Sequence, residues 1–376
     1  MTLTSMSKII DIPNDIKIQI INMKLIYTLT LTLFLQFAYG QSAQDFADIG
    51  YSAMQKQDYN VGLTNFSKAI QADPKKAWFY HNRAVCYDAL EKYQNAIADF
   101  TKALSIEKTA DSYNGIGITY TNLNNFNEAI KNFKLALILD KTNVETYFNL
   151  GYAYGNLKKY PEALNSFNNA IKITPKHYSS LHGRAITLIT MSRYNEALVD
   201  LNTIDTMKPN DLEIIRYRAM CYYEAKQYKN AINDYSKLIE ADNKDVTLLS
   251  KRANCYKFNE EPDKAIIDFS SILTVIKNSN SNWLIAETYY WRGDLYSDAG
   301  KYELAINDFT ECLKLSPDNI EATLYRAISK FNNNDSIGAC IDYLKAKEKD
   351  IDKLFIYQSI LKNDPNYFID NFKFCK

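Results

Sequence analysis

Histidine, cysteine and acidic residues are the side chains that most often bind metals or perform catalysis, and this chain does not group them. It has three histidines, His81, His177 and His182. The last two are five residues apart and would not share one face of a helix. No cysteine or acidic cluster has the spacing of metal ligands, and no glycine-rich phosphate loop, Gly-x-Ser-x-Gly or His-Glu-x-x-His motif occurs. We therefore expect a protein that is not an enzyme and uses no cofactor.

One tripeptide suggests a different activity. Arg292-Gly293-Asp294 is the sequence that many adhesion ligands present to integrins. Such a ligand must lie in an exposed loop, so its surroundings decide whether this reading is tenable.

The composition excludes some classes of partner. Lysine plus arginine equals aspartate plus glutamate, 44 of each, so the chain has no net basic field to hold nucleic acid or an anionic membrane. Hydrophobic residues make up 47%, which is enough for a buried core. We expect no nucleic acid and no small-molecule substrate.

The N-terminal region resembles a secretory signal. Met23 and Lys24 precede an apolar run over residues 25–40, which ends in Ala38-Tyr39-Gly40, with small residues where a signal peptidase reads. We predict a targeting segment over 1–40, with cleavage after Gly40 and with Met23 as an alternative start. The alternatives are an uncleaved membrane anchor or a buried helix, although sixteen residues are short for a membrane span. The expected location is periplasmic, envelope-associated or secreted, and the alternative is anchorage in the membrane.

From Ala43 onward the sequence repeats itself. A small residue recurs at intervals of 34, 33, 34, 34, 34, 34, 40 and 34 residues, at Gly62, Ala96, Ala129, Ala163, Ala197, Ala231, Ala265, Ala305 and Ala339. Twelve residues before each of them stands another Gly or Ala, and four residues after stands a large residue, usually Phe. Apolar residues in each half recur every three or four positions, as in an amphipathic helix. Each unit is therefore a pair of helices that must stack on its neighbours to bury its apolar face.

This pattern resembles the tetratricopeptide repeat family. The shared features are the 34-residue period, small residues at repeat positions 8 and 20, a large residue at 24 and a frequent proline at 32, over about Ala43 to Ile351. The resemblance implies an all-α fold, a right-handed superhelical solenoid of nine helix-turn-helix repeats over 41–353, with a concave groove lined by the first helix of each pair. We expect a loop at the insertion over 277–283. The tail over 354–376 should cap the last repeat through Phe355, Ile360, Leu361, Phe368 and Phe372.

Two repeat positions change together. Six repeats carry arginine at position 7 and aspartate at position 23, and the other three carry neither. Because these positions face each other across a helical hairpin, we predict an Arg–Asp ion pair inside each of the six repeats, with energetic coupling between its members. The pairs are Arg83–Asp99, Arg184–Asp200, Arg218–Asp234, Arg252–Asp268, Arg292–Asp308 and Arg326–Asp342. Arg292 would then have a structural role, which disfavours adhesion.

The cysteines have two readings. Six cysteines in an exported chain favour disulfides. However, Cys86, Cys221 and Cys255 share repeat position 10, and equivalent positions of stacked helices are too far apart to bridge. We expect these three to be small core residues, and a bond to Cys375 stays open.

The groove is the remaining candidate site. In the family it is lined by repeat positions 2, 5, 9, 12 and 13, and aromatic rings beside amides at such positions would suit an extended peptide. The alternative is that some of these rings pack on one another. The candidate residues are Tyr51, Trp78, His81, Phe148, Tyr152, Arg216, Tyr223, Phe258 and Tyr290. The clamp of Lys and Asn that some relatives use to bind chaperone C-termini is absent, because Ala47 and Tyr51 stand at those positions.

These observations predict a non-enzymatic scaffold, exported to the cell envelope, that binds a protein or peptide in its groove. The alternative is a regulatory or assembly subunit of an envelope or signalling complex, held at the membrane by an uncleaved N-terminus.

Overall fold

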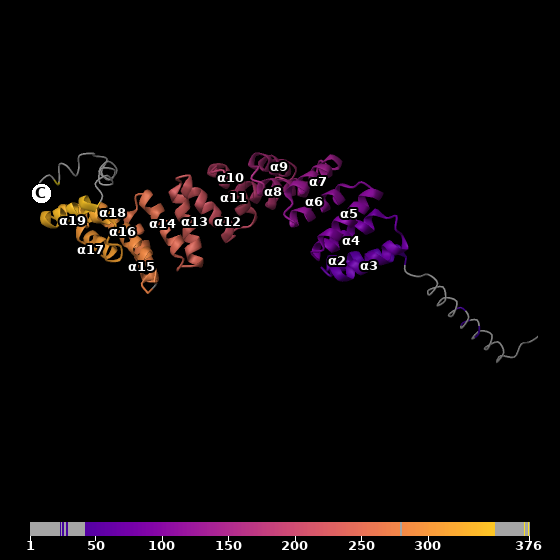
Figure 1. Cartoon of the computed structure of the whole chain (residues 1–376), viewed down its shortest axis with the longest axis horizontal. Helices are drawn as coiled ribbons and strands as arrows, with labels where there is room; N and C mark the ends of the chain where they lie inside the picture. The colour runs from indigo at the N-terminus through magenta and orange to yellow at the C-terminus, as the bar shows by residue number, and fades with distance from the viewer. Residues whose placement is uncertain are drawn as a thin grey trace, which may run out of the picture. The chain divides into compact units, whose positions relative to one another are not determined.

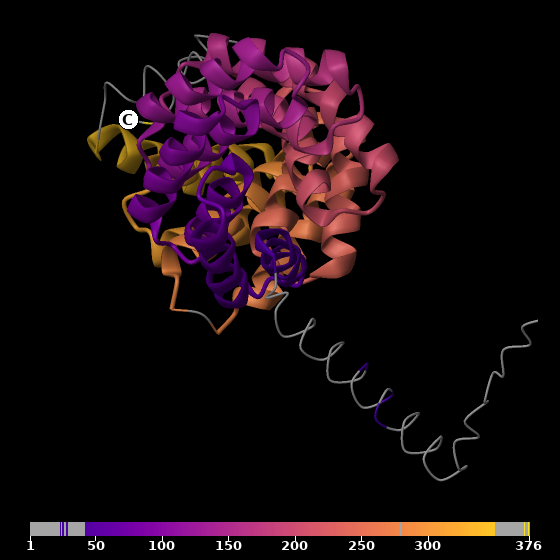
Figure 2. The same ribbon diagram turned by 90° about the vertical axis from the view of Figure 1, so that its right-hand side faces the viewer.

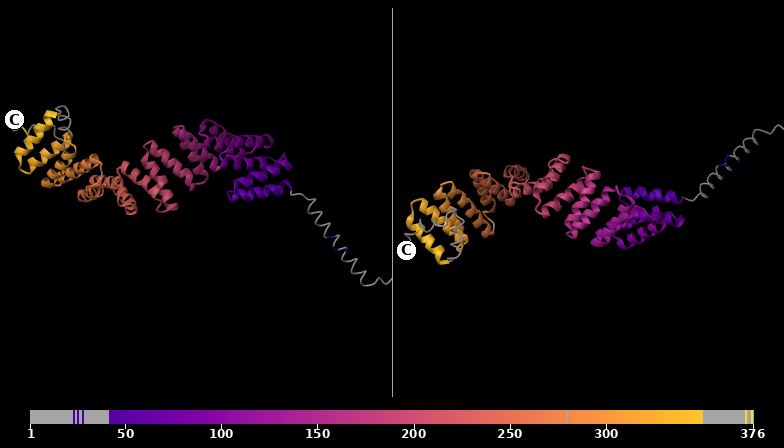
Figure 3. Two further views of the ribbon diagram at one scale, coloured as in Figure 1. Left: turned by 60° about the horizontal axis from the view of Figure 1, so that its bottom comes forward. Right: turned by 90° about the horizontal axis from the view of Figure 1, so that it is seen from above.

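The structure is a computed structural model that describes residues 42–278 and 280–349, together with residues 23, 25, 28, 372 and 375. The described ranges contain eighteen α-helices, α2 to α19, and no strand. Figures 1, 2 and 3 show from several directions that successive helices lie as antiparallel pairs. No helix within these ranges is both long and apolar enough to span a bilayer. The all-α repeat solenoid expected from the sequence is confirmed, while the predicted targeting segment lies outside the two ranges.

The chain divides into two units, residues 1–173 and 174–376. The first unit contains four helical hairpins: α2 (Ala43–Gln55) with α3 (Tyr59–Ala72), α4 (Ala77–Ala89) with α5 (Tyr93–Ile106), α6 (Ala110–Asn122) with α7 (Phe126–Leu139), and α8 (Val144–Asn156) with α9 (Tyr160–Ile173). The second contains five: α10 (Tyr178–Thr190) with α11 (Tyr194–Met207), α12 (Leu212–Glu224) with α13 (Tyr228–Ala241), α14 (Val246–Phe258) with α15 (Pro262–Ile276), α16 (Asn282–Asp298) with α17 (Tyr302–Leu315), and α18 (Ile320–Asn332) with α19 (Ser336–Lys349). Within each unit the second helix of a hairpin packs against the first helix of the next.

Local sequence sets where the helices begin and turn. Several first helices start after a residue whose side chain accepts a backbone N–H, such as Asn143 for α8 and Asp245 for α14. Each hairpin turn contains one residue with positive φ, and only one of these nine is glycine, Gly300. The left-handed conformation ends the first helix and lets the chain reverse within three residues.

Small residues and large rings interlock at the centre of each hairpin. The position-20 alanines are fully buried, and the large residues at position 24 are at most 8% exposed. A Cβ added at Gly117 would lie 2.4 Å from the Phe133 ring, and one added at Gly293 would lie 3.1 Å from the Phe309 ring. The small residue at position 8 is therefore what lets the ring at position 24 lie between the two helices, as the repeat pattern predicts.

The predicted loop over 277–283 is confirmed at residues 277, 278, 280 and 281, and Asn282 and Trp283 already belong to α16. Most of the added length of this repeat lies in the two flanking helices. Helix α16 has 17 residues where every other first helix has 13, and α15 has 15 where the other second helices have 14. Leu284 and Ile285, in the added turn, pack against the core cluster of α12 to α16. Partial burial of these two side chains stabilises the added turn of α16, while Asn278, Asn280 and Ser281 lie in the connection between α15 and α16.

The tail covers the last repeat at two described points. Phe372 is 2% exposed, and its ring centroid lies 4.9 Å from that of Tyr343 and 5.4 Å from that of Phe331. Cys375 forms a disulfide with Cys340 of α19, with the two Cα atoms 5.3 Å apart. The predicted cap is confirmed for Phe372. Phe355, Ile360, Leu361 and Phe368 lie outside the described residues.

Candidate functional site

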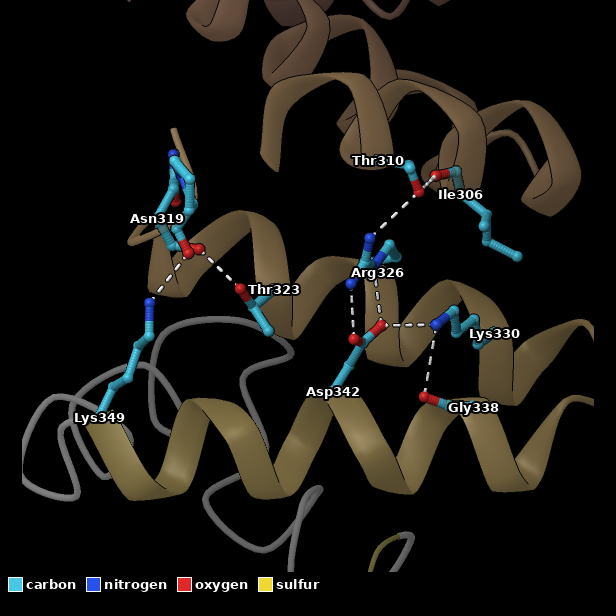
Figure 4. Close-up of polar contacts among 10 residues, drawn as sticks. Ile306, Thr310, Asn319, Thr323, Arg326, Lys330, Gly338, Asp342 and Lys349 are labelled. Atoms are coloured by element: carbon cyan, nitrogen blue, oxygen red, sulfur yellow. Dashed lines mark hydrogen bonds and ion pairs between the residues drawn. The ribbon is translucent and has the colours of Figure 1, made fainter. Parts of the chain in front are cut away.

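The six predicted Arg–Asp pairs are all present. In each, Nε and Nη2 of the arginine donate to the two carboxylate oxygens of the aspartate, over 2.5 to 2.9 Å. Figure 4 shows the pair of Arg326 and Asp342, where Lys330 adds a second cation 2.9 Å from the carboxylate. The aspartate side chains are 1 to 11% exposed. These arginines hold each hairpin together and are not available to a ligand.

Five of these arginines also contact the preceding repeat, which we did not predict from the sequence. The third donor, Nη1, meets a side chain at position 25 of that repeat, 2.9 to 3.3 Å away. These acceptors are Ser67, Asn202, Ser236, Ser270 and Thr310. One guanidinium therefore joins two helices of its own repeat and one helix of its neighbour. A signal was available, because all five acceptors are polar and immediately follow the large residue at position 24.

The adhesion tripeptide is structural. It lies inside helix α16, with Arg292 bound to Asp308 and Gly293 packed against Phe309. Asp294 is 6% exposed and accepts a hydrogen bond from Lys257 Nζ at 2.7 Å. The charges of Arg292 and Asp294 are therefore already paired. The tripeptide is helical and is not the exposed loop that a receptor would need to bind it.

In the first unit, three predicted groove aromatics are exposed on first helices. Tyr51 of α2 is 44% exposed, Trp78 of α4 is 41% and Tyr152 of α8 is 50%. The rings of Tyr51 and Trp78 lie 6.1 Å apart, so two consecutive repeats share an exposed aromatic surface. Phe148 is half-buried, with its ring 6.2 Å from that of Phe167.

His81 of the same unit is partly buried. Its Nδ1 lies 3.0 Å from the hydroxyl of Ser112 on α6, and its ring packs on the edge of Phe100. Burial lowers the pKa of His81, and the nearby Asp111 carboxylate opposes that shift. The imidazole is therefore neutral at pH 7.

In the second unit, Arg216 and Phe258 are exposed and Tyr223 is half-buried. Phe258 is 52% exposed, and its ring stacks on Tyr228 at 5.1 Å. The Lys251 ammonium lies 5.1 Å from the Tyr223 ring. Part of this aromatic surface is thus already occupied by neighbouring side chains of the protein, which the sequence analysis held open as the alternative.

Tyr290 does not belong to the exposed surface. It is 8% exposed and its ring lies among those of Trp291, Phe309 and Tyr325. The cause is its position: it faces Phe309, the large residue at position 24 of the same hairpin. The prediction that Tyr290 binds a partner is therefore wrong, because a partner could not reach its buried ring.

Models of repeat families match several of these hairpins. The model described as "Tetratricopeptide repeat" matches residues 77–109, 144–177 and 286–319, and a second model of that description matches 216–242. A model described as "TPR repeat" matches 117–158. The chain contains tetratricopeptide repeats. The family resemblance drawn from the 34-residue period is confirmed.

Two curated proteins resemble short parts of the chain. It is 34% identical over 65 residues to the small glutamine-rich tetratricopeptide repeat-containing protein 2 of Saccharomyces cerevisiae, which covers 17% of this chain and 19% of that protein. It is 34% identical over 67 residues to the protein STIP1 homolog of Dictyostelium discoideum, which covers 18% and 12%. The chain thus spans about a fifth or less of the length of these curated relatives.

Two solved structures align with longer parts of the chain. A tetratricopeptide repeat protein from Parabacteroides merdae covers 65% of this chain and 96% of its own, at 21% identity and a TM-score of 0.45. PilW, whose structure is titled as that of a widely conserved type IV pilus biogenesis factor, covers 54% and 94%, at 19% identity and a TM-score of 0.48.

Four cysteines of the tetratricopeptide array lie within its packing. Cys86, Cys221, Cys255 and Cys312 are buried thiols, so the core role predicted for the first three is confirmed. Burial raises the pKa of Cys86 to about 11 and that of Cys221 to about 12, which keeps both protonated. Among the described residues, no group of three or more His, Cys, Asp or Glu side chains could hold a metal ion.

Proposed function

We propose that this protein is a non-enzymatic interaction scaffold that binds a protein or peptide partner on the first helices of its repeats. The observation that supports this proposal is that large aromatic rings on the first helices are exposed to solvent. Tyr51, Trp78, Tyr152 and Phe258 are 41 to 52% exposed, whereas the rings at position 24 are buried. Exposed aromatic rings bury a large area at a small cost in side-chain entropy when a partner covers them.

We further propose that the chain acts in the cell envelope or outside the cell. The support is the predicted signal over residues 1–40 and the disulfide between Cys340 and Cys375. Disulfides persist in oxidising compartments and are rare in the cytosol. The second candidate is an anchored regulatory or assembly subunit. The N-terminal residue of the chain purified from cells distinguishes them: Gln41 supports the free scaffold, and Met1 or Met23 supports the anchored form.

Partner capture tests the binding surface. The full chain, expressed in cells with an affinity tag, is compared with a variant that carries Tyr51, Trp78, Tyr152 and Phe258 changed to alanine. The matched control changes the exposed second-helix residues Val199, Ile267, Ile337 and Ile341, which are 62 to 79% exposed. Helicity must be equal in all three proteins. A partner lost only by the aromatic variant supports the proposal, and a partner lost only by the control variant overturns it.

A further inference from the structure

A cavity in the first unit lies beside one of the exposed rings. It has a volume of about 200 Å³ and is formed by the start of α4, the connection between α5 and α6, and the start of α6. Its lining residues are Ala77, Trp78, His81, Asn82, Glu107, Thr109, Asp111 and Ser112. This volume is below the roughly 300–1,000 Å³ of pockets that enclose whole small molecules, so the cavity suits one side chain of a larger ligand.

The walls of the cavity are held in place. The Trp78 ring packs against the rings of Tyr51, Phe66 and Phe79, with centroids 5.8 to 6.1 Å away. On α6, Ser112 is 2% exposed, and its hydroxyl lies 3.0 Å from His81 Nδ1 and 2.9 Å from the Thr109 hydroxyl. A ligand group would therefore meet a fixed aromatic surface and a fixed polar surface.

The charge of the cavity is negative. Glu107 and Asp111 are exposed, and within residues 42–278 and 280–349 no hydrogen bond or ion pair engages either carboxylate. No lysine or arginine lines the cavity, although Lys76 and Lys108 adjoin it in sequence, and His81 is neutral at pH 7 because it is buried. The N-terminus of α6 contributes about half a positive charge. Two carboxylates outweigh that charge, so an anion is disfavoured.

The groove positions around the cavity have the same sign. Across the four repeats of the first unit, positions 2, 5, 9, 12 and 13 carry three acidic residues, Asp88, Asp111 and Glu145, and no lysine or arginine. A polypeptide that covered Tyr51, Trp78 and Tyr152 would therefore gain most from basic side chains.

We propose that this cavity is a recognition pocket for one basic side chain, arginine or lysine, of the bound partner. The cation lies against the face of Trp78, where the ring quadrupole attracts it. Asp111 and Glu107 pair with its charge, and Asn82, Thr109 and Ser112 surround its polar atoms. This inference rests on the proposed function, because it names the side chain that the scaffold recognises.

The probe is a set of eight-residue peptide libraries without other charged residues. The fixed central position carries arginine, lysine, citrulline, norleucine or glutamate, and retention on the immobilised full chain is measured. Citrulline keeps the shape and hydrogen bonds of arginine but not its charge. We expect arginine and lysine libraries to be retained about tenfold more than citrulline or norleucine, and glutamate least. Higher salt should reduce the preference.

Two variants test whether the preference for arginine over citrulline depends on the carboxylates of the cavity. Asp111→Asn combined with Glu107→Gln should reduce the arginine-to-citrulline ratio to about one. The control Glu162→Gln removes an exposed carboxylate from α9 of the same unit and should leave the ratio unchanged. Equal retention of arginine and citrulline by the native chain, or an unchanged ratio in the double variant, overturns the pocket but leaves the scaffold intact. Retention of none of the libraries counts against both the pocket and peptide binding by the groove.

Discussion

The ion pair of Arg218 and Asp234 offers the strongest test of how the repeats are held together. The Arg218 side chain is 8% exposed and that of Asp234 is 2%. Arg218 donates to Asp234 at 2.7 and 2.9 Å, and its third nitrogen lies 2.7 Å from Asp205 of the preceding repeat. These hydrogen bonds raise the pKa of Arg218, so it stays charged.

The two members of the pair should not cost the same to remove. Arg218→Ala leaves the buried carboxylate of Asp234 without a cation, since no other ion pair engages it within residues 42–278. We expect a loss of about 3–5 kcal/mol in the free energy of unfolding, the range for breaking a buried pair. Asp234→Ala leaves Arg218 with Asp205, which is 27% exposed and partly solvated. We expect that variant to lose about 1–3 kcal/mol.

A double-mutant cycle separates the pair from its surroundings. The combined variant removes both charges, so its loss should fall short of the sum of the single losses by about 1–3 kcal/mol. Arg216→Ala is the matched control, because Arg216 lies two residues away, is 58% exposed and is 3.9 Å from Asp245. It should cost less than about 1 kcal/mol.

The assay must report on this part of the array. Repeat proteins can unfold in parts, so a single transition over the whole chain is not assured. Hydrogen exchange of amides in α12 and α13 measures the local opening free energy there. Additive losses across the cycle, or equal losses for Arg218→Ala and Arg216→Ala, would refute the reasoning.

Three further predictions follow from packing and burial. Gly151→Ala should lower the thermal midpoint of unfolding, because the new Cβ would lie 2.7 Å from the Phe167 ring. Gly155→Ala should raise that midpoint, because its Cβ meets nothing within 4 Å and alanine favours the helix over glycine by about 1 kcal/mol. Equal shifts of the two variants would contradict this account. Iodoacetamide at pH 8 should label Cys86 only after denaturation, as mass spectrometry would show, because burial raises its pKa to about 11. Cys375→Ser removes the disulfide to Cys340 of α19 and should speed limited proteolysis of the tail. An unchanged cleavage rate would argue against a tail that the disulfide holds on the last repeat.

The redox state of Cys340 and Cys375 also bears on the chain's location. If Cys340 and Cys375 are found reduced in protein isolated under thiol-blocking conditions, the disulfide no longer supports an oxidising compartment. The signal over 1–40 would then be the remaining support for export.

Contacts that recur in several repeats could be predicted from the sequence. Arg218 and Asp234 were paired because positions 7 and 23 change together, and the packing of Gly117 against Phe133 followed from the alternation of small and large residues. Such contacts lie within one hairpin and return every 34 residues, so the period exposes them. The family resemblance placed Trp78 at a groove position, and its ring is 41% exposed.

The tertiary structure decided what depends on non-equivalent neighbours. Tyr290 occupies a groove position by register, yet its hairpin partner Phe309 and the neighbouring Tyr325 enclose it. The added turn of α16 depends on the packing of Leu284 against the core of the preceding repeats. The disulfide depends on Cys375 lying beside Cys340 of α19. Among the described residues, the added helical turn and the disulfide occur once. The ring contacts of Tyr290 have counterparts in His81 with Phe100 and in His182 with Tyr217, but among the same residues only at Tyr290 do aromatic rings from both neighbours enclose a tyrosine. A periodic sequence pattern cannot predict a contact that depends on one particular pair of neighbours. Such a contact forms only when the folded chain brings residues that are distant in sequence together.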